Sequence, residues 1–214
     1  MKPYYQGDGV TIYHGDCFEV LPELPKVDLV LTDPPYGISL KENGRNGHNW
    51  DISGDKTTVA GRHFLAWCER GNVPTVAFAH PRKPWPSDWR CLLVWDKGPT
   101  VGGGGDPSTC WKQTWELIQV ARTGKLNGKR DEAVLRYHIT QQNYHLHPCQ
   151  KPIALLSYLI GKTTNVGDLI LDSFAGSGST LLAAKREGRK SIGIEIEEEY
   201  CEIAANRLAQ GVLF

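Results

Sequence analysis

The sequence of 214 residues lacks several features that would point directly to a function. Lys and Arg together number 24, as do Asp and Glu, so the zero net charge does not by itself indicate a polyanionic partner. The 6 cysteines form no C-x-x-C pair and no signal peptide is recognisable, which favours a reduced, cytoplasmic protein. No apolar run approaches the roughly 18 residues needed to cross a bilayer, which excludes a membrane role.

Apolar runs bounded by turn residues predict an α/β protein. Several runs have apolar residues at consecutive positions, which is typical of strands covered on both faces in a mainly parallel sheet. The predicted strands span residues 10–13, 27–32, 73–79, 91–95, 115–121, 169–174 and 191–196. The predicted helices span residues 16–24, 57–70, 153–162, 179–187 and 197–209. Their alternation predicts a doubly wound fold, with helices on both faces of the sheet, in one domain over residues 1–214.

Three stretches fit neither a helix nor a strand pattern: about 37–56, 96–113 and 123–146. They are rich in Gly, Asn, Pro and charged residues. Long irregular segments in a compact α/β domain are usually functional loops or disordered segments. We therefore interpret these stretches as insertions at one rim of the sheet.

Residues 169–180 read LILDSFAGSGST and lead from a predicted buried strand through a tight turn into a helix. Gly176 and Gly178 in this turn allow the backbone to approach a ligand closely, although such glycines also serve packing alone. Glu195 follows at the end of the next predicted strand, where its carboxylate can accept hydrogen bonds from both ribose hydroxyls of an adenosine. Together these features predict a ligand that contains adenosine.

The same loop disfavours a dinucleotide. Leu181 stands where the dinucleotide fingerprint has its third glycine, so NAD, with its pyrophosphate, fits less well than an adenosine without phosphate. The hydroxyls of Ser179 and Thr180 and the N–H groups at the helix N-terminus can hold a carboxylate, such as that of S-adenosylmethionine. S-adenosylmethionine is therefore the predicted cofactor, and a nicotinamide oxidoreductase is the rival hypothesis.

A second candidate site is the sequence Asp33-Pro34-Pro35-Tyr36, which follows the predicted strand at 27–32. Proline has no N–H, so two prolines end the strand at the place where open α/β sheets bind ligands. The Asp33 carboxylate and the Pro34 carbonyl can each accept one N–H of an aromatic amino group. Both contacts steer the nitrogen toward tetrahedral geometry and direct its lone pair at a methyl donor. Tyr36 can stack on the base, which is worth on the order of 1–3 kcal/mol.

These two motifs together resemble the DNA amino-methyltransferases, and the Asp-Pro-Pro-Tyr corner precedes the glycine loop as in the β class of that family. Residues 12–17 (IYHGDC) resemble the amino-terminal strand and turn of the class, and residues 147–152 (HPCQKP) resemble its H-P-x-x-K-P element. Residues 95–98 and 115–118 are similar to weaker landmarks between them. Chance does not readily produce four motifs in this permuted order. The resemblance implies a Rossmann-like methyltransferase fold.

The resemblance also implies roles for individual residues. It makes Asp33, Pro34, Pro35 and Tyr36 the catalytic corner. Asp16 is expected to contact the adenine of the cofactor. The full set of implied cofactor-binding residues is Asp16, Cys17, Asp33, Lys151, Asp172, Phe174, Ala175, Gly176, Ser177, Gly178, Ser179, Thr180, Glu195 and Ile196.

The implied reaction is methyl transfer from S-adenosylmethionine to N6 of adenine in double-stranded DNA, after the base flips out of the duplex. Asp at the first corner position resembles adenine-modifying members, whereas cytosine-modifying members more often have Ser there. N4 of cytosine remains the alternative, since both bases present a similar pair of N–H groups, and RNA is a further alternative substrate. A hypothesis of another class is a protein that binds cofactor or DNA without turnover. Intact Asp33 and an intact glycine loop argue against it.

Members of the family with strict sequence specificity usually have a recognisable target-recognition domain, whereas here only 96–113 and 123–146 can serve as one. The recognition sequence therefore stays open. Basic residues near these loops are predicted to contact DNA phosphates, with a solvated charged loop as the alternative. They are Lys41, Arg45, Arg122, Lys125, Lys129, Arg130 and Arg136. The resemblance further implies a bacterial or phage protein, often a homodimer, and leaves a cognate restriction enzyme open.

A cluster of His138, His145, His147 and Cys149 invites a comparison with zinc sites. The intervals between these residues do not match the paired spacings of structural zinc ligands, so we expect no metal. The five tryptophans between residues 85 and 115 are expected to pack in the core or at its rim.

Overall fold

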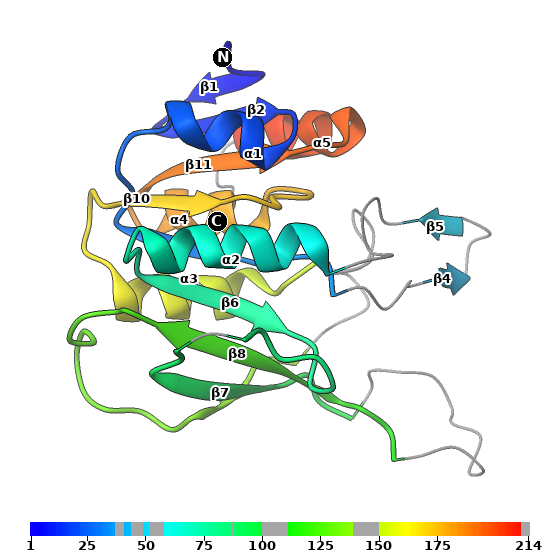
Figure 1. The fold of residues 1–214 in the computed structure, drawn as a ribbon, viewed down its shortest axis with the longest axis vertical. Coiled ribbons are helices and arrows are strands. Elements are labelled where there is room, and N and C mark those ends of the chain that lie inside the picture. The colour runs from blue at the N-terminus through cyan, green and yellow to red at the C-terminus, as the bar shows by residue number, and fades with distance from the viewer. Residues whose placement is uncertain are drawn as a thin grey trace.

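A nine-stranded mixed sheet forms the centre of the protein (Figure 1). The structure, a computed structural model, describes residues 1–36, 58–86, 88–99, 111–138 and 150–210, and the backbone of residues 41–43 and 49–51. Some of the predictions concern residues beyond these ranges: Arg45, His145, His147 and Cys149 lie outside the described residues, as does the side chain of Lys41.

The strand order in the sheet is β1-β2-β11-β10-β3-β6-β8-β7-β9. Neighbours from β2 to β6 in this order pair in parallel, as do β7 and β9, whereas β1, β6 and β7 each have an antiparallel neighbour. The strands are β1 (Tyr5–Gly7), β2 (Val10–His14), β3 (Leu29–Thr32), β6 (Thr75–Ala79), β7 (Cys91–Asp96), β8 (Trp115–Ala121), β9 (Val134–Arg136), β10 (Leu169–Asp172) and β11 (Lys190–Glu195). A separate antiparallel hairpin pairs β4 (Lys41–Asn43) with β5 (Asn49–Asp51).

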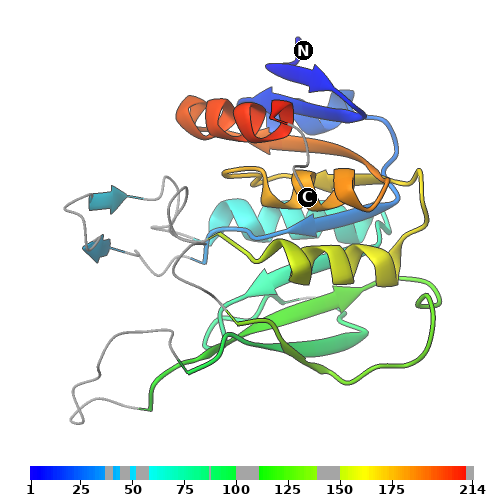
Figure 2. The ribbon, with the colours of Figure 1, turned by 180° about the vertical axis from the view of Figure 1, so that it is seen from behind.

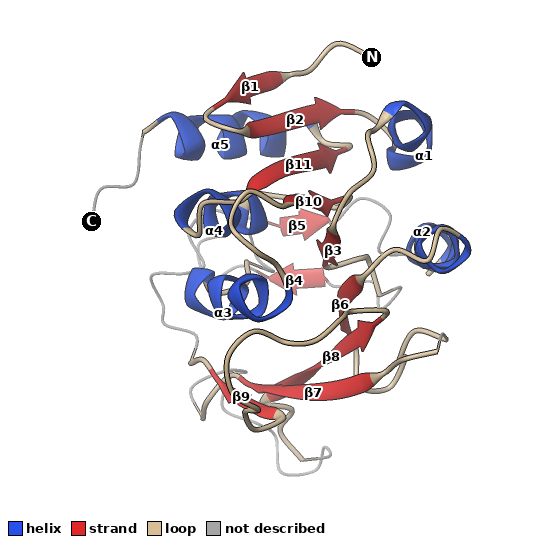
Figure 3. Ribbon diagram, turned by 90° about the vertical axis from the view of Figure 1, so that its left-hand side faces the viewer, coloured by secondary structure: helices blue, strands red, loops and turns tan. Residues whose placement is uncertain are grey.

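Helices cover both faces of this sheet. Seen along the strands, α3, α4 and α5 lie on one face and α1 and α2 on the other (Figure 3). Their bounds are α1 (Cys17–Val20), α2 (Val59–Arg70), α3 (Ile153–Thr163), α4 (Ser179–Arg186) and α5 (Glu198–Ala209), with a 3-10 turn η1 at Leu21–Glu23. From behind, α3, α4 and α5 form one continuous layer (Figure 2). None of the described helices is long and apolar enough to span a membrane.

The central strands explain why the sequence pattern was informative. Every residue of β3 and of β6 is buried, as expected for strands with helices on both faces. The predicted doubly wound, mainly parallel α/β fold is confirmed, and all seven predicted strands and five predicted helices are present.

The predictions missed the short strands. β1 and β9 have three residues each, and β9 falls inside the stretch 123–146 that was interpreted as irregular. Strands of this length show too little alternation to be recognised, and their hydrogen bonds to β2 and β7 define them. The predicted helix 16–24 is also shorter, because Pro22 cannot donate the backbone hydrogen bond that would continue α1.

Candidate active site

A cavity of about 240 Å³ opens at the carboxyl ends of β2, β3, β10 and β11. It is lined by every predicted catalytic residue and by every predicted cofactor-binding residue except Gly178. These lining residues are Asp16, Cys17, Asp33, Pro34, Pro35, Tyr36, Lys151, Asp172, Phe174, Ala175, Gly176, Ser177, Ser179, Thr180, Glu195 and Ile196. The corner and the glycine loop are far apart in the sequence, and the sheet order brings them together because β3 pairs with β10.

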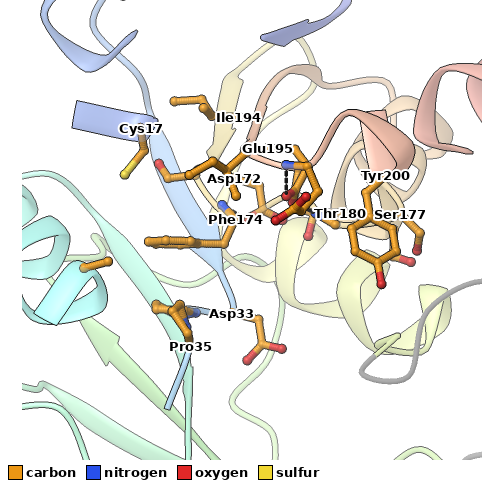
Figure 4. A pocket seen from close by; sticks show the side chains of 18 of the residues that line it. Cys17, Asp33, Pro35, Asp172, Phe174, Ser177, Thr180, Ile194, Glu195 and Tyr200 are labelled. Carbon is orange, nitrogen blue, oxygen red and sulfur yellow. Dashed lines mark hydrogen bonds between the residues drawn. The ribbon is translucent and has the colours of Figure 1, made fainter. Parts of the chain in front are cut away.

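The glycine loop is tied to Glu195 through its backbone. The N–H of Gly176 donates to Glu195 Oε2 at 2.7 Å, and the N–H of Glu197 donates to Oε1 at 2.9 Å. Burial raises the pKa of Glu195, while these backbone donors oppose the shift. Figure 4 shows Asp33, Phe174 and Glu195 facing the same pocket. A carboxylate held in this way is oriented before any ligand arrives.

Gly178 has a packing role, which is the alternative that the sequence left open for the glycines of this loop. Its φ of +76° is in the left-handed region, and a Cβ there would lie 2.8 Å from the Cβ of Ala204 on α5. Gly178 therefore lets α5 pack against the loop. Arg207, also on α5, donates to the carbonyl of Ser177 and to Ser179 Oγ, the latter at 3.3 Å. This arginine was not among the predicted site residues, because nothing in its local sequence marks the contact.

Asp172 and Asp16 have roles inside the protein as well as positions on the pocket. Asp172 is buried at the end of β10, where its Oδ1 accepts from Thr32 Oγ1 at 2.8 Å and from the N–H of Phe174 at 3.2 Å. Burial raises the pKa of Asp172 to about 6. Asp16 caps α1 by accepting from the N–H of Phe18 at 2.8 Å. Both residues hold pocket walls in place.

At the Asp-Pro-Pro-Tyr corner, both oxygens of Asp33 accept hydrogen bonds. Tyr36 Oη donates to Oδ1, and Lys151 Nζ donates to Oδ2 at 2.5 Å. Pro34 packs against α2, where Gly61 has no side chain and leaves room for Pro34 and the indole of Trp85. Burial raises the pKa of Asp33 above its ordinary value; the Lys151 ammonium opposes this shift, and the Glu116 carboxylate adds to it.

A second carboxylate lies behind Lys151. Glu116 Oε2 is 3.3 Å from Lys151 Nζ, and Glu116 Oε1 accepts from Lys97 Nζ. Burial alone would raise the pKa of Glu116, but the ammonium groups of Lys151 and Lys97 outweigh it and hold the pKa below its usual value. Lys97 and Glu116 fall in the weaker landmarks at 95–98 and 115–118, and their ion pair is visible only in the folded chain.

Most of the predicted DNA-binding arginines and lysines lie away from the pocket. Ala121, the last residue of β8, pairs with Thr75 at the start of β6. Because β6 is parallel to β3, the segment after β8 leaves the sheet at the end opposite to the carboxyl end of β3, where Asp33 follows. The view of β6 and β8 in Figure 1 shows this arrangement. Arg122 there donates to the carbonyl of Val73 at 3.0 Å. Arg136 lies at the other end of the strands, the end that carries the pocket, because it pairs in register with Asp96 at the carboxyl end of β7. The residues on the far edge are Arg122, Lys125, Lys129 and Arg130.

The remaining expectations concern metals and tryptophans. The described residues contain no group of three or more His, Cys, Asp or Glu that could hold a metal ion, and only His138 of the predicted cluster is among them. Trp85 and Trp95 are buried, as expected, whereas Trp111 is 96% exposed and does not pack in the core.

Sequence comparison decides the family. The profile of the N6/N4 methyltransferase family, described as DNA methylase, matches residues 81–206. The chain belongs to this family. Type II methyltransferase M2.DpnII of Streptococcus pneumoniae is 55% identical over 262 residues, covering 97% of this chain and 92% of the relative. DNA adenine methyltransferase YhdJ of Escherichia coli (strain K12) is 47% identical over 264 residues, covering 95% of this chain and 84% of the relative. The predicted DNA amino-methyltransferase is therefore confirmed at the level of the family.

Solved structures agree with this assignment. The complex of M1.HpyAVI with SAM has a TM-score of 0.67 and 28% identity, covering 92% of this chain and 99% of the other. PvuII DNA methyltransferase, by its name cytosine-N4-specific, has a TM-score of 0.71 at 21% identity, covering 96% of this chain and 88% of the other. The likeness to PvuII DNA methyltransferase shows a shared fold alone. The chain is thus a DNA amino-methyltransferase with the fold that the sequence predicted.

Proposed function

We propose that the protein transfers the methyl group of S-adenosylmethionine to N6 of adenine in double-stranded DNA. The observation that carries this proposal is the shared cavity. The Asp33 carboxylate, which suits an amino group, and the glycine loop with Glu195, which suits an adenosine, line the same pocket. A methyl donor and an acceptor amine bound there would lie next to each other, as an in-line displacement requires.

The chemistry of the pocket fits the cofactor part by part. Glu195 presents two carboxylate oxygens for the ribose hydroxyls. Phe174 offers an aromatic wall, itself packed edge-on against Phe64 at 5.7 Å between ring centroids. Ser177 and Thr180 place hydroxyl groups at the start of α4, where a carboxylate is favoured. When bound, the cofactor supplies a sulfonium methyl group.

The Asp33 corner prepares the amino group. An amine conjugated to a purine ring is a poor nucleophile, because its lone pair is delocalised. Asp33 and the carbonyl of Pro34 accept its two N–H groups and favour a tetrahedral nitrogen. That nitrogen forms a bond to the methyl carbon while the carbon–sulfur bond breaks and its electron pair stays on sulfur. The extra N–H proton then leaves through Asp33 to water.

Adenine is the proposed base for two reasons. YhdJ, a relative at 47% identity, is by its name a DNA adenine methyltransferase. Asp at the first corner position, here Asp33, also matches the adenine-modifying pattern. N4-cytosine is the alternative, since the family profile includes both activities. A homodimer remains a prediction, and a cognate restriction enzyme stays open.

For DNA to deliver a flipped base to Asp33, its phosphates must contact the rim of the pocket. Arg82 and Lys83 are exposed and follow β6 at this rim, close to His80, whose ring centroid is 6.1 Å from that of Tyr36. We therefore propose phosphate contacts at Arg82 and Lys83. Contacts at residues 122–130, on the other edge, remain a prediction from the sequence.

The experiment that tests the substrate class is methyl transfer with a radiolabelled cofactor. Equal amounts of duplex DNA, single-stranded DNA and RNA of the same sequence are incubated with the protein and with the Asp33→Ala variant. Label in duplex DNA that depends on Asp33 supports the proposal. Label confined to RNA, or absent from all three while the cofactor binds, would refute it.

A further inference from the structure

Four charged side chains form a row from the pocket into the protein: Asp33, Lys151, Glu116 and Lys97. They come from the end of β3, the segment before α3, the start of β8 and the segment after β7. Lys151 Nζ lies 2.5 Å from Asp33 Oδ2 and 3.3 Å from Glu116 Oε2, and Lys97 contacts the other oxygen of Glu116. Negative and positive groups thus alternate, and one ammonium serves two carboxylates.

The position of Glu116 needs an explanation. Glu116 and Lys97 are not among the residues that line the described pocket, and Lys151 Nζ lies between Glu116 and Asp33. Both side chains are nevertheless mostly buried, at 14% and 16% exposure. Burying an ion pair costs desolvation energy and often stabilises a fold less than apolar packing does. A role in the chemistry of Asp33 is therefore a better reason for this pair than stability alone.

In the proposed reaction, Lys151 and the target base compete for Asp33, and Glu116 can bind Lys151 instead. Asp33 must accept an N–H from the target base, yet its Oδ2 already accepts from Lys151. If Lys151 had no second anion, it would compete with the base for Asp33 throughout the reaction. The rings of Phe78, Trp95 and Tyr36 lie 4.9, 5.9 and 5.9 Å from Lys151 Nζ and hold the ammonium between the two carboxylates.

We propose that Glu116, anchored by Lys97, is a positioning residue for methyl transfer. Glu116 binds the Lys151 ammonium when Asp33 turns its carboxylate toward the target amino group. Lys97 keeps Glu116 paired while Lys151 serves Asp33, so Glu116 is not left as a lone buried charge in that arrangement. This inference rests on the proposed function, in which Asp33 accepts the amino N–H.

The first test is Glu116→Gln, which keeps the shape and removes the charge. We expect kcat to fall about 10- to 100-fold, the range of losses that follow misplacement of a reacting group. KM for the cofactor and for duplex DNA should change little, because Glu116 does not line the described pocket. The matched control is Glu69→Gln, an exposed acid near the end of α2. Unchanged kcat in Glu116→Gln would overturn the proposal.

A second background tests whether Glu116 acts on turnover through Lys151. In Lys151→Met the ammonium is gone, so Glu116 acts on Asp33 only as a like charge. Adding Glu116→Gln should then leave kcat unchanged or raise it, although the same change is harmful beside Lys151. Independent roles of the two residues predict instead that the two losses multiply. Glu116→Asp, which keeps the charge, should retain more turnover than Glu116→Gln, and equal losses would count against positioning.

The pairing also has a readout that does not need turnover. Urea unfolding of the wild type, the two single variants and the double variant should give a coupling between Glu116 and Lys151. No coupling would overturn the shared ammonium. If the coupling is present but the wild type methylates no nucleic acid, the proposed function fails. If the wild type is active and Glu116→Gln matches it, only the positioning role fails.

Discussion

Single side chains determine whether the pocket can bind and react. Asp33→Ala removes the proposed acceptor of the amino N–H, so turnover should fall at least ~10²-fold, as for loss of a preorganised polar contact. Cofactor affinity should stay nearly constant, because Lys151 can remain paired with Glu116. Initial rates and calorimetric titration measure the two quantities. Asp88→Ala, on the exposed surface, is the control, and full turnover in Asp33→Ala would refute the assigned role.

Glu195 belongs to the proposed cofactor side of the pocket. Glu195→Gln keeps one oxygen acceptor but loses the charge and the second acceptor, so the dissociation constant for S-adenosylmethionine should rise about 10- to 100-fold. Rates at saturating cofactor should change much less. Isothermal titration gives the affinity, with Glu198→Gln on the exposed first turn of α5 as control. An unaltered dissociation constant would place the ribose elsewhere.

Asp172 makes stability depend on pH. Its folded pKa of about 6 lies above the ordinary value of 3.8, so the protonated form is favoured in the folded state. The contribution of protonated Asp172 to the free energy of unfolding is therefore fully present below about pH 4. It is lost as the pH rises through about 6. The loss is on the order of 3 kcal/mol, since each pKa unit corresponds to about 1.4 kcal/mol.

Asp172→Asn should remove this dependence, because the amide can keep the bonds from Thr32 and Phe174 but cannot ionise. The free energy of unfolding in urea, measured from pH 4 to pH 7, checks it for both proteins. A decline with pH of the same size in the variant would show that another group is responsible.

At the scale of elements, α2 packs against the proposed catalytic corner. A Cβ at Gly61 would lie 2.7 Å from Trp85 and 2.9 Å from the Cβ of Pro34. Gly61→Ala should therefore displace the corner, costing about 1–3 kcal/mol of stability through overpacking and lowering kcat. Gly161 in α3 is a matched control, because a Cβ there meets nothing within 4 Å.

Gly161→Ala should keep full activity and gain up to about 1 kcal/mol from helix propensity. Thermal unfolding and initial rates of the two variants check the prediction. Equal stability and equal rates in both would mean that α2 does not position Pro34.

The elements also show what the sequence can predict. The corner and the glycine loop were recognisable because each needs particular residues at fixed spacing along one strand and turn. The strands β3 and β6 were recognisable because both faces are buried. By contrast, the Lys151–Glu116 pair depends on how β8 inserts beside β6, and β9 depends on its pairing with β7. Contacts across the sheet leave no local pattern to recognise.

At the scale of the whole molecule, the orientation of the sheet decides where DNA can bind. Arg82 and Lys83 lie at the edge that carries the pocket, whereas the segment containing Lys125, Lys129 and Arg130 leaves β8 at the other edge. Reversing Arg82 and Lys83 to Glu should reduce the slope of log K for duplex DNA against log salt by up to about 2. Reversing the other three should change it much less.

Fluorescence anisotropy with a labelled duplex, measured over a range of salt concentrations, gives both slopes. The two sets of variants are controls for each other, because each alters exposed basic residues. If only the set at residues 125–130 flattens the slope, the DNA lies across the far edge, and the sequence-based prediction is the correct one.

The central claim is that the Asp33 corner and the Glu195 pocket methylate N6 of adenine, and the modified nucleoside tests it most directly. Duplex DNA treated with the protein and S-adenosylmethionine is digested to nucleosides and analysed by mass spectrometry against standards. We predict N6-methyladenine, absent from the Asp33→Ala reaction. N4-methylcytosine as the product, or no methylated nucleoside from a protein that binds the cofactor, would contradict the claim.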